Sequence, residues 1–152
     1  MDREMKHGLT LVELLVTISI LSILVGIGLY SYKSYSNKRD LENDIYKIYS
    51  FANKTRVSAF TDKENYYIYL AGGGLNIIMD NDTNELNGYI EVINLKIKFI
   101  SDNSSYLFDK NGFLKSNGKI YPEEVYDVQY NCILFSDMVY LGKLNGANCE
   151  KN

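Results

Sequence analysis

Glu13 is a carboxylic acid inside an apolar segment, and it is the N-terminal residue best placed to do chemistry. All other side chains from residue 9 to residue 29 are apolar, small or hydroxylated. At about 1.5 Å per residue this segment would span about 30 Å as a helix, which is the thickness of the hydrocarbon core of a bilayer. An ionisable group at that depth costs on the order of a few kcal/mol and by default has a function, so Glu13 needs a cationic partner.

Cutting the chain after Gly8 would create such a partner. The cut gives Leu9 a free α-amine one helical turn before Glu13. The amine could be the chain's own or that of a neighbouring subunit staggered along a filament, and either would neutralise the carboxylate. Only the second arrangement would drive assembly.

The apolar segment has two other interpretations. A cleavable secretory signal would need a shorter apolar run and a small-x-small cleavage site, and residues 24–35 contain no such site. A plain signal anchor that holds a soluble domain at the surface fits the length and the hydropathy, but it gives Glu13 no role. Lys and Arg residues flank both ends of the segment in similar numbers, so the positive-inside rule does not fix the orientation.

The residues KHG followed by LTLVELL resemble the prepilin processing site of type IV pilin-like proteins. In that motif a short charged leader ends in Gly, an apolar residue follows, and Glu is fifth in the mature chain. The matching positions are Gly8, Thr10, Leu11, Glu13 and Leu14, with Leu9 where Phe or Met is commoner. The resemblance implies that a membrane prepilin peptidase cuts after Gly8 on the cytoplasmic side and methylates the amine of Leu9.

The same resemblance implies partners and a location. The partners are the prepilin peptidase, other pilin or pseudopilin subunits, an inner-membrane assembly platform and membrane lipid. The protein would cross the inner membrane once, with its head outside the cytoplasm, before it joins a pilus or pseudopilus. Charge counting could not supply this orientation.

The order of the expected elements, one long helix followed by strands, predicts an α+β fold. We expect a leader at 1–8, a transmembrane and polymerisation helix at 9–30, an amphipathic continuation at 31–60 and a β-rich head at 61–152. No proline interrupts residues 9–60. Beyond Tyr30 the apolar residues recur every three or four positions, at Leu41, Ile45, Ile48, Ala52 and Ala59, with polar residues that include Asp44 between them.

The head is predicted to be an antiparallel sheet that wraps the outer half of the helix. Strands are expected at 66–70, 75–79, 89–100, 106–108, 119–121, 132–135 and 138–143. Alternation is clearest in the third of them, at Ile90, Val92, Leu95, Ile97 and Phe99. Glycine-rich or acidic turns separate the strands, among them a tight hairpin turn at residues 72–74.

The second half of the chain resembles the GspH/FimT type of minor pseudopilin. Arg56 and Ala59 stand before the first strand, residues 108–120 resemble an F-x-x-x-G hairpin, and residues 132–144 resemble a final strand pair. The resemblance implies a minor subunit of a type IV pilus or type II secretion-like filament. Two alternatives stay open, namely a DNA-binding or adhesive subunit at a filament tip and a membrane-anchored surface domain unrelated to filaments.

The two cysteines, Cys132 and Cys149, are predicted to form one disulfide if the head lies outside the cytoplasm. Closing the loop 132–149 would add roughly 3 kcal/mol in the chain-entropy model. The alternative is two unpaired thiols.

Residues 80–91 resemble a calcium-binding loop, with Asp80, Asp82 and Asn84 at alternate positions and Glu91 twelfth. Glu85 takes the sixth position, where the loop normally has Gly. We therefore favour a solvated acidic turn, with Ca²⁺ binding as the alternative.

Composition disfavours catalysis and nucleic-acid binding. The net charge of −3 argues against a mainly electrostatic nucleic-acid binder, and the visible basic cluster is only Lys110, Lys115 and Lys119. Cleavage after Gly8 would remove His7, the single histidine, and no C-x-x-C, G-x-S-x-G or P-loop pattern is present. We predict neither an enzyme nor a bound cofactor.

Overall fold

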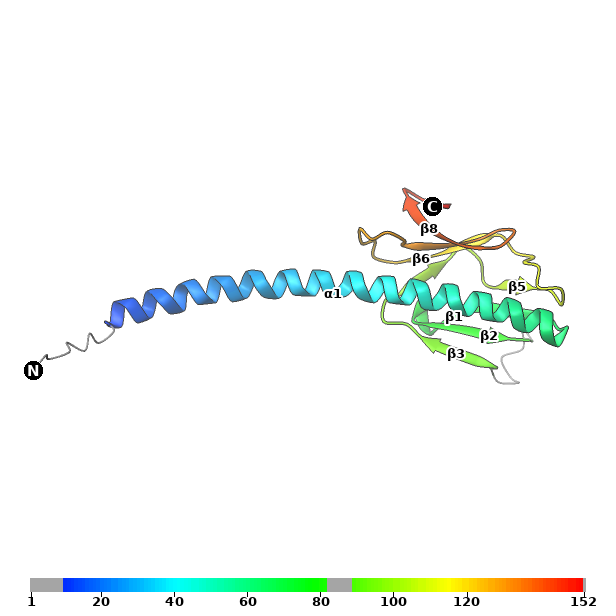
Figure 1. Ribbon diagram of the computed structural model, residues 1–152, viewed down its shortest axis with the longest axis horizontal. Coiled ribbons are helices and arrows are strands. Elements are labelled where there is room, and N and C mark those ends of the chain that lie inside the picture. The colour runs from blue at the N-terminus through cyan, green and yellow to red at the C-terminus, as the bar shows by residue number, and fades with distance from the viewer. Residues whose placement is uncertain (1–9, 82–88, 152) are drawn as a thin grey trace, which may run out of the picture. The chain divides into compact units, whose positions relative to one another are not determined.

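The computed structural model describes residues 10–81 and 89–151 (Figure 1). These residues form two compact units, one that ends at Ser36 and one that covers Asn37–Asn152. The helix α1, Leu11–Asp62, contributes to both units. It ends before Lys63, whose φ of 60° is the left-handed conformation that commonly follows the last helical turn.

The second unit contains two antiparallel sheets. The first sheet has the strand order β3-β2-β1-β5 and the second has the order β4-β6-β7-β8-β9. The strands of the first are β1 Tyr66–Ala71, β2 Asn76–Asp80, β3 Glu91–Asn94 and β5 Tyr106–Phe108. Those of the second are β4 Phe99–Ser101, β6 Gly118–Pro122, β7 Cys132–Phe135, β8 Val139–Asn145 and β9 Asn148–Lys151.

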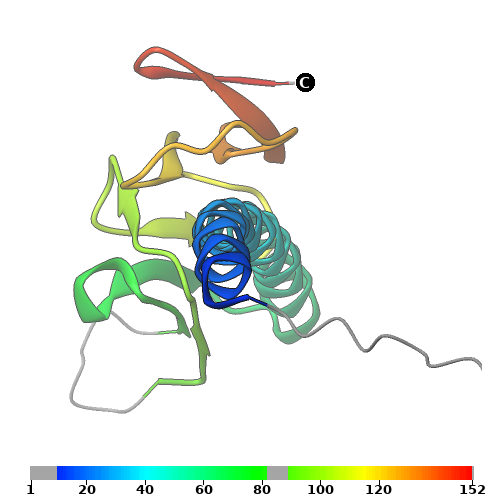
Figure 2. The ribbon, with the colours of Figure 1, turned by 90° about the vertical axis from the view of Figure 1, so that its left-hand side faces the viewer.

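The core of this unit lies between α1 and the two sheets. Figure 2 shows the green strands β1–β3 on one side and the yellow to red strands β6–β9 on the other. The five helix residues predicted to face inward, Leu41, Ile45, Ile48, Ala52 and Ala59, are all fully buried. Ile68 and Ile77 from the first sheet and Ile120 and Ile133 from the second belong to the same cluster. The 3.6-residue period of the helix therefore predicted its buried face correctly.

Tyr106 joins the two sheets. Its ring on β5 stacks on the ring of Phe135 on β7, with 3.9 Å between the ring centroids and 14° between the planes. Its hydroxyl donates a hydrogen bond of 2.8 Å to the carbonyl of Lys119 on β6. Only 1% of Tyr106 is exposed, so both the aromatic contact and the hydrogen bond are shielded from water.

The prediction of one continuous strand at 89–100 is wrong. The segment forms β3 and β4, which belong to different sheets. Ile90 and Val92, two of the alternating apolar residues, are exposed, whereas Ile93 packs against the core. The connection at 95–98 turns the chain from one sheet to the other, and the expected single sheet is therefore two.

Asp44 of α1 holds this connection. Its Oδ2 accepts hydrogen bonds from the backbone amides of Lys96 and Ile97, at 2.5 and 2.9 Å, and its Oδ1 accepts one from Lys47 at 2.7 Å. Asp44 is fully buried. Its expected place among the solvated residues of the helix is wrong, because its carboxylate replaces the strand hydrogen bonds that these amides lack.

The turn between β1 and β2 is the short helix η1, Gly72–Gly74, and it closes the hairpin expected there. All three glycines have positive φ. A Cβ on Gly74 would lie 2.0 Å from the backbone oxygen of Phe99 on β4. Only glycine lets the two sheets approach this closely here.

The edge strand β9 was not predicted.

Candidate functional site

Glu13 lies in the first turn of α1, where Thr10 binds it. The backbone amide and the hydroxyl of Thr10 each donate a hydrogen bond of 2.8 Å to Glu13 Oε2. In return the Thr10 hydroxyl accepts from the Glu13 amide at 3.3 Å. This reciprocal arrangement is a capping box, which starts the helix at the position where the sequence TLVE allows it.

The capping box does not depend on the peptide bond between Gly8 and Leu9. Gly8 and Leu9 lie outside the described residues, but both donors to Glu13 belong to Thr10. In the described part of the chain these bonds use Oε2, so Oε1 can take a hydrogen bond from another donor. Thr10 thus orients the carboxylate without neutralising it.

The helix that follows has the properties of a membrane span. By length and composition it is apolar enough to cross a membrane, and none of the residues in its most apolar stretch is buried. The hydroxyls of Thr17, Ser19 and Ser22 donate back to backbone carbonyls three or four residues earlier, at 2.8 Å each. These polar groups are therefore satisfied within the helix, as an apolar surrounding requires.

Three exposed tyrosines follow the apolar segment. Tyr30, Tyr32 and Tyr35 are 81%, 71% and 61% exposed, and Lys38 and Arg39 come next in the sequence. Tyrosines next to basic residues are typical of the border between hydrocarbon and water. This composition indicates where the helix would leave the membrane.

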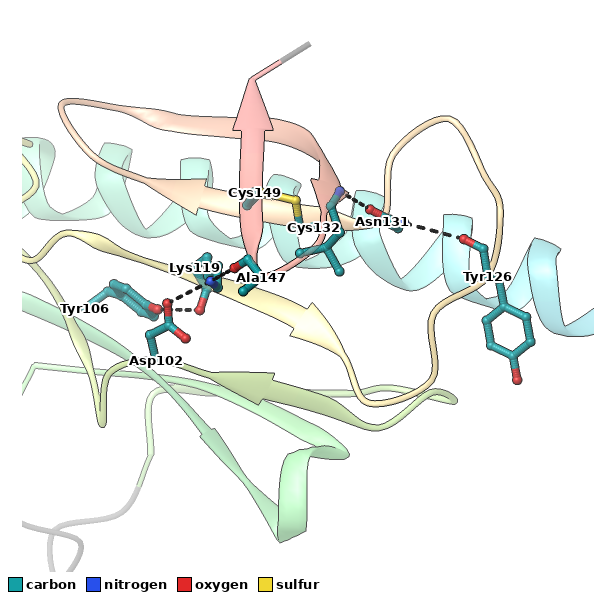
Figure 3. Close-up of a disulfide and its surroundings, with 9 residues drawn as sticks. Asp102, Tyr106, Lys119, Tyr126, Asn131, Cys132, Ala147 and Cys149 are labelled. Carbon is teal, nitrogen blue, oxygen red and sulfur yellow. Dashed lines mark hydrogen bonds and ion pairs between the residues drawn. A yellow bond between two sulfur atoms is a disulfide. The ribbon is translucent and has the colours of Figure 1, made fainter.

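The predicted disulfide between Cys132 and Cys149 is present (Figure 3). It joins β7 to β9 across β8, with 6.1 Å between the two Cα atoms. A Cβ on Gly142 of β8 would lie 2.7 Å from Cys149 Sγ and 3.2 Å from Cys132 Sγ. Gly142 therefore leaves the space that the disulfide fills.

Asn131, beside Cys132, connects a loop to β8. Its Oδ1 accepts from the amide of Leu144 at 2.7 Å, and its Nδ2 donates to the carbonyl of Tyr126 at 3.5 Å (Figure 3). Only 2% of Asn131 is exposed. These two hydrogen bonds attach the loop between β6 and β7 to strand β8.

The calcium-loop candidates are only partly described. Asp82 and Asn84 lie outside the described residues, and Asp80 is 2% exposed. Glu91 Oε2 forms an ion pair of 2.5 Å with Lys54. Within 10–81 and 89–151 no three His, Cys, Asp or Glu side chains form a group that could hold a metal.

Two of the three lysines in the basic cluster have carboxylate partners. Lys115 pairs with Asp109 at 3.1 Å, and Lys119 pairs with Asp102 at 3.5 Å. Lys119 also donates to the carbonyl of Ala147. These partners offset much of the positive charge that a phosphate backbone would need.

A groove that the sequence did not reveal lies at the C-terminal end of α1. Arg56 Nε donates to the carbonyl of Gly112 at 3.0 Å, which joins the helix to the turn after β5. The lining residues are Asn53, Arg56, Val57, Phe60, Asn111, Gly112 and Phe113. The sequence contains one signal of this groove: Val57 and Phe60 are apolar, but they lie outside the helical stripe that faces the core.

Two comparisons with known proteins gave matches. The prokaryotic N-terminal methylation motif matches residues 3–29. The fold matches two crystal forms of the type IV minor pilin FimU from Pseudomonas aeruginosa PAO1. The form in space group P21 is 9% identical with a TM-score of 0.59 over 72% of this chain and 92% of that chain. The form in P65 is 10% identical with a TM-score of 0.56 over 68% and 93%.

A search of curated proteins found no match. The chain therefore has a prokaryotic N-terminal methylation motif and an α+β fold similar to that of a type IV minor pilin.

Proposed function

We propose that this chain is a minor pilin or pseudopilin that is processed after Gly8 and assembled through α1. The observation that carries the proposal is the placement of Glu13. Glu13 is the single carboxylate of the apolar segment and lies in the first turn of a helix that is long enough to cross a membrane. Thr10 orients this carboxylate without supplying a positive charge.

Processing would supply that charge. A prepilin peptidase cuts after Gly8 on the cytoplasmic face and methylates the new amine of Leu9, while the head stays outside. The methylated amine keeps its charge and is the cation that a neighbouring Glu13 requires at this depth. Cleavage and polymerisation then depend on the same pair of groups.

The finer assignment is a GspH/FimT-type minor subunit of a type IV pilus or type II secretion-like filament. Two residues that carry the resemblance support it, because Arg56 binds the backbone of Gly112 in the F-x-x-x-G hairpin. Ala59, which belongs to the same segment, is fully buried.

The test is intact-mass and N-terminal analysis of the protein from membranes of a host that has a prepilin peptidase. The expected chain begins at Leu9 and carries one added methyl group. A peptidase-deficient host is the control and should yield the chain with its leader. An intact leader and an unmodified chain in both hosts would remove the proposal.

A further inference from the structure

The groove at the end of α1 exposes three large apolar side chains. Val57, Phe60 and Phe113 are 63%, 56% and 58% exposed. Arg56 is the charged residue among those that line the groove, and Lys63 stands 3.8 Å above the ring of Phe60. An apolar surface with a cationic border fits a partner that offers an apolar side chain next to a carboxylate.

The nearby carboxylates do not neutralise the positive charge at the edge of the groove. Asp62 accepts a hydrogen bond from the Tyr66 hydroxyl at 2.7 Å, and Asp109 pairs with Lys115. Arg56 donates its hydrogen bond to a neutral acceptor, the carbonyl of Gly112. Among the described residues, the charge of Arg56 therefore has no carboxylate to balance it.

Phe113 is held in place by a tight turn. Asp109 Oδ1 accepts from the amides of Asn111 and Phe113, at 3.0 and 2.9 Å, and the Gly112 amide donates to the Asp109 carbonyl at 2.7 Å. The hydrogen bond from the Phe113 amide, with those from Lys115 and the Asn111 amide, holds the pKa of Asp109 below its ordinary value. The wall of the groove is thus formed before any partner arrives.

The same unit carries a complementary loop at residues 123–127. Val125 at its tip is 62% exposed, and Glu123, Glu124 and Asp127 give the loop three negative charges. Glu123 and Asp127 form exposed ion pairs with Lys98 and Lys143, which are weak because water competes for them.

Glu124 is the acid best placed to meet a partner. It accepts a hydrogen bond of 2.6 Å from the Tyr126 hydroxyl and, among the described residues, has no cation beside it. The Tyr126 hydroxyl also accepts from Asn37 at 3.3 Å. The loop is therefore fixed to α1 at Asn37.

The loop and the groove lie at opposite ends of the second unit. The loop contacts Asn37, and the groove begins at Asn53 and reaches Phe60 on the same helix. About 20 residues at 1.5 Å each separate Asn37 from Val57, which gives about 30 Å. In Figure 1 the gold loop and the green end of α1 mark the two ends.

We infer that the loop of one copy of this chain docks in the groove of the next copy. Val125 packs between Val57, Phe60 and Phe113, and Glu124 pairs with Arg56. Such a contact joins two different surfaces of neighbouring copies, which is the arrangement that builds a filament when the rotation between copies does not close a ring. This inference rests on the proposed filament function and adds a second contact, between heads, to the one at Glu13.

The test is photo-crosslinking of the full-length chain in membranes, with p-benzoylphenylalanine in place of Phe113. The expected product is a covalent dimer whose trypsin digest, after reduction, joins the Phe113 peptide to the peptide of residues 120–143. The same probe in place of Val92, an exposed residue of β3, is the control and should not reach that peptide. A cross-link from position 113 to a different protein, or no dimer, would overturn the inference.

Charge reversal identifies the pair. Arg56→Glu and Glu124→Arg should each lower the yield of dimer at least about tenfold, because like charges then meet. The two changes together should restore most of it. Absence of both effects would reject the pairing of these residues.

Arg56→Glu also removes the bond to Gly112, so a second set of variants avoids that bond. Val125→Asp and Val57→Asp change exposed side chains, and each should abolish the dimer in a folded protein. A dimer that survives both would overturn the contact. A processed chain that forms no dimer removes this contact alone, whereas an unprocessed chain removes the filament function whatever the cross-link shows.

Discussion

At the scale of single residues, Glu13 stands out in the sequence as a candidate assembly residue. A carboxylate in an apolar segment is visible in the sequence because it is expensive. The capping box with Thr10 could also be found there, since Thr and Glu stand three positions apart before an apolar run. Asp44 could not, because its burial depends on two amides that are distant in the sequence.

Glu13→Gln should impair assembly and leave cleavage after Gly8 largely intact. The amide keeps an oxygen that can accept the Thr10 hydrogen bonds, but it has no charge for a neighbour's amine. The measurements are the leader-cleaved fraction by mass spectrometry and the amount of the protein in sheared filaments. Ser19→Ala is the matched control, since its hydroxyl bonds only its own helix. Normal incorporation of Glu13→Gln would contradict the electrostatic mechanism.

Tyr106 should make the head sensitive to alkaline pH. Burial raises the pKa of Tyr106 to about 12, from 10.0, and the hydrogen bond to Asp62 raises the pKa of Tyr66 to about 12. Between about pH 10 and about pH 12, both tyrosines lose their protons in the unfolded chain but keep them in the folded chain. The free energy of unfolding therefore falls as the pH rises through this range.

Denaturant unfolding at pH 8, 10 and 11 would measure this fall. Tyr106→Phe should cost about 1 kcal/mol at pH 8, through the lost hydrogen bond to Lys119, and should reduce the alkaline decline. An unchanged decline in that variant would assign the effect to other groups.

At the scale of elements, the sequence predicted the helix better than the strands. The helix carries its own period, and the five predicted core positions are all buried. The strand at 89–100 was misassigned because Val92 and Leu95 are three positions apart, which breaks a period of two. This change of spacing indicates in the sequence that the strand breaks. That its two parts, β3 and β4, belong to different sheets could be seen only in the structure, where Asp44 binds the connection.

Asp44→Leu should destabilise the second unit by about 2–4 kcal/mol, because two backbone amides of the β3–β4 connection lose their buried acceptor. Thermal and urea unfolding of the full chain in detergent would measure it. Asn43→Ala, one position away and exposed, is the control and should stay within about 0.5 kcal/mol of the unaltered protein. Equal effects of the two changes would show that the carboxylate does not hold the connection.

The disulfide should stabilise the edge strand β9. Replacing both cysteines, as Cys132→Ala with Cys149→Ala, frees the loop 132–149 and should lower the free energy of unfolding by roughly 3 kcal/mol. Amide hydrogen exchange should increase first in β9, which pairs with β8 alone. Protection of β9 equal to that of the unaltered protein would contradict this role.

At the scale of the whole molecule, the two units have separate sources of stability. The first unit is an apolar helix whose described side chains are nearly all exposed, so its stability depends on lipid or on neighbouring helices. The second unit contains the mixed core of α1 and both sheets. Hydropathy follows a similar division, because apolar residues are continuous from 9 to 29 and recur every three or four positions from Leu41 to Ala59.

The fragment 37–152 should therefore fold without a membrane. Every buried side chain of the described core lies at or beyond Leu41, so removing residues 1–36 exposes no core surface. Its thermal midpoint by circular dichroism should lie within about 5 °C of that of the full chain in detergent, a difference of about 1 kcal/mol. The fragment 49–152 is the control, because it also lacks Leu41, Ile45 and Ile48 and should not unfold cooperatively. A non-cooperative 37–152 would mean that the apolar half of α1 supports the head, and the two units would then share one source of stability.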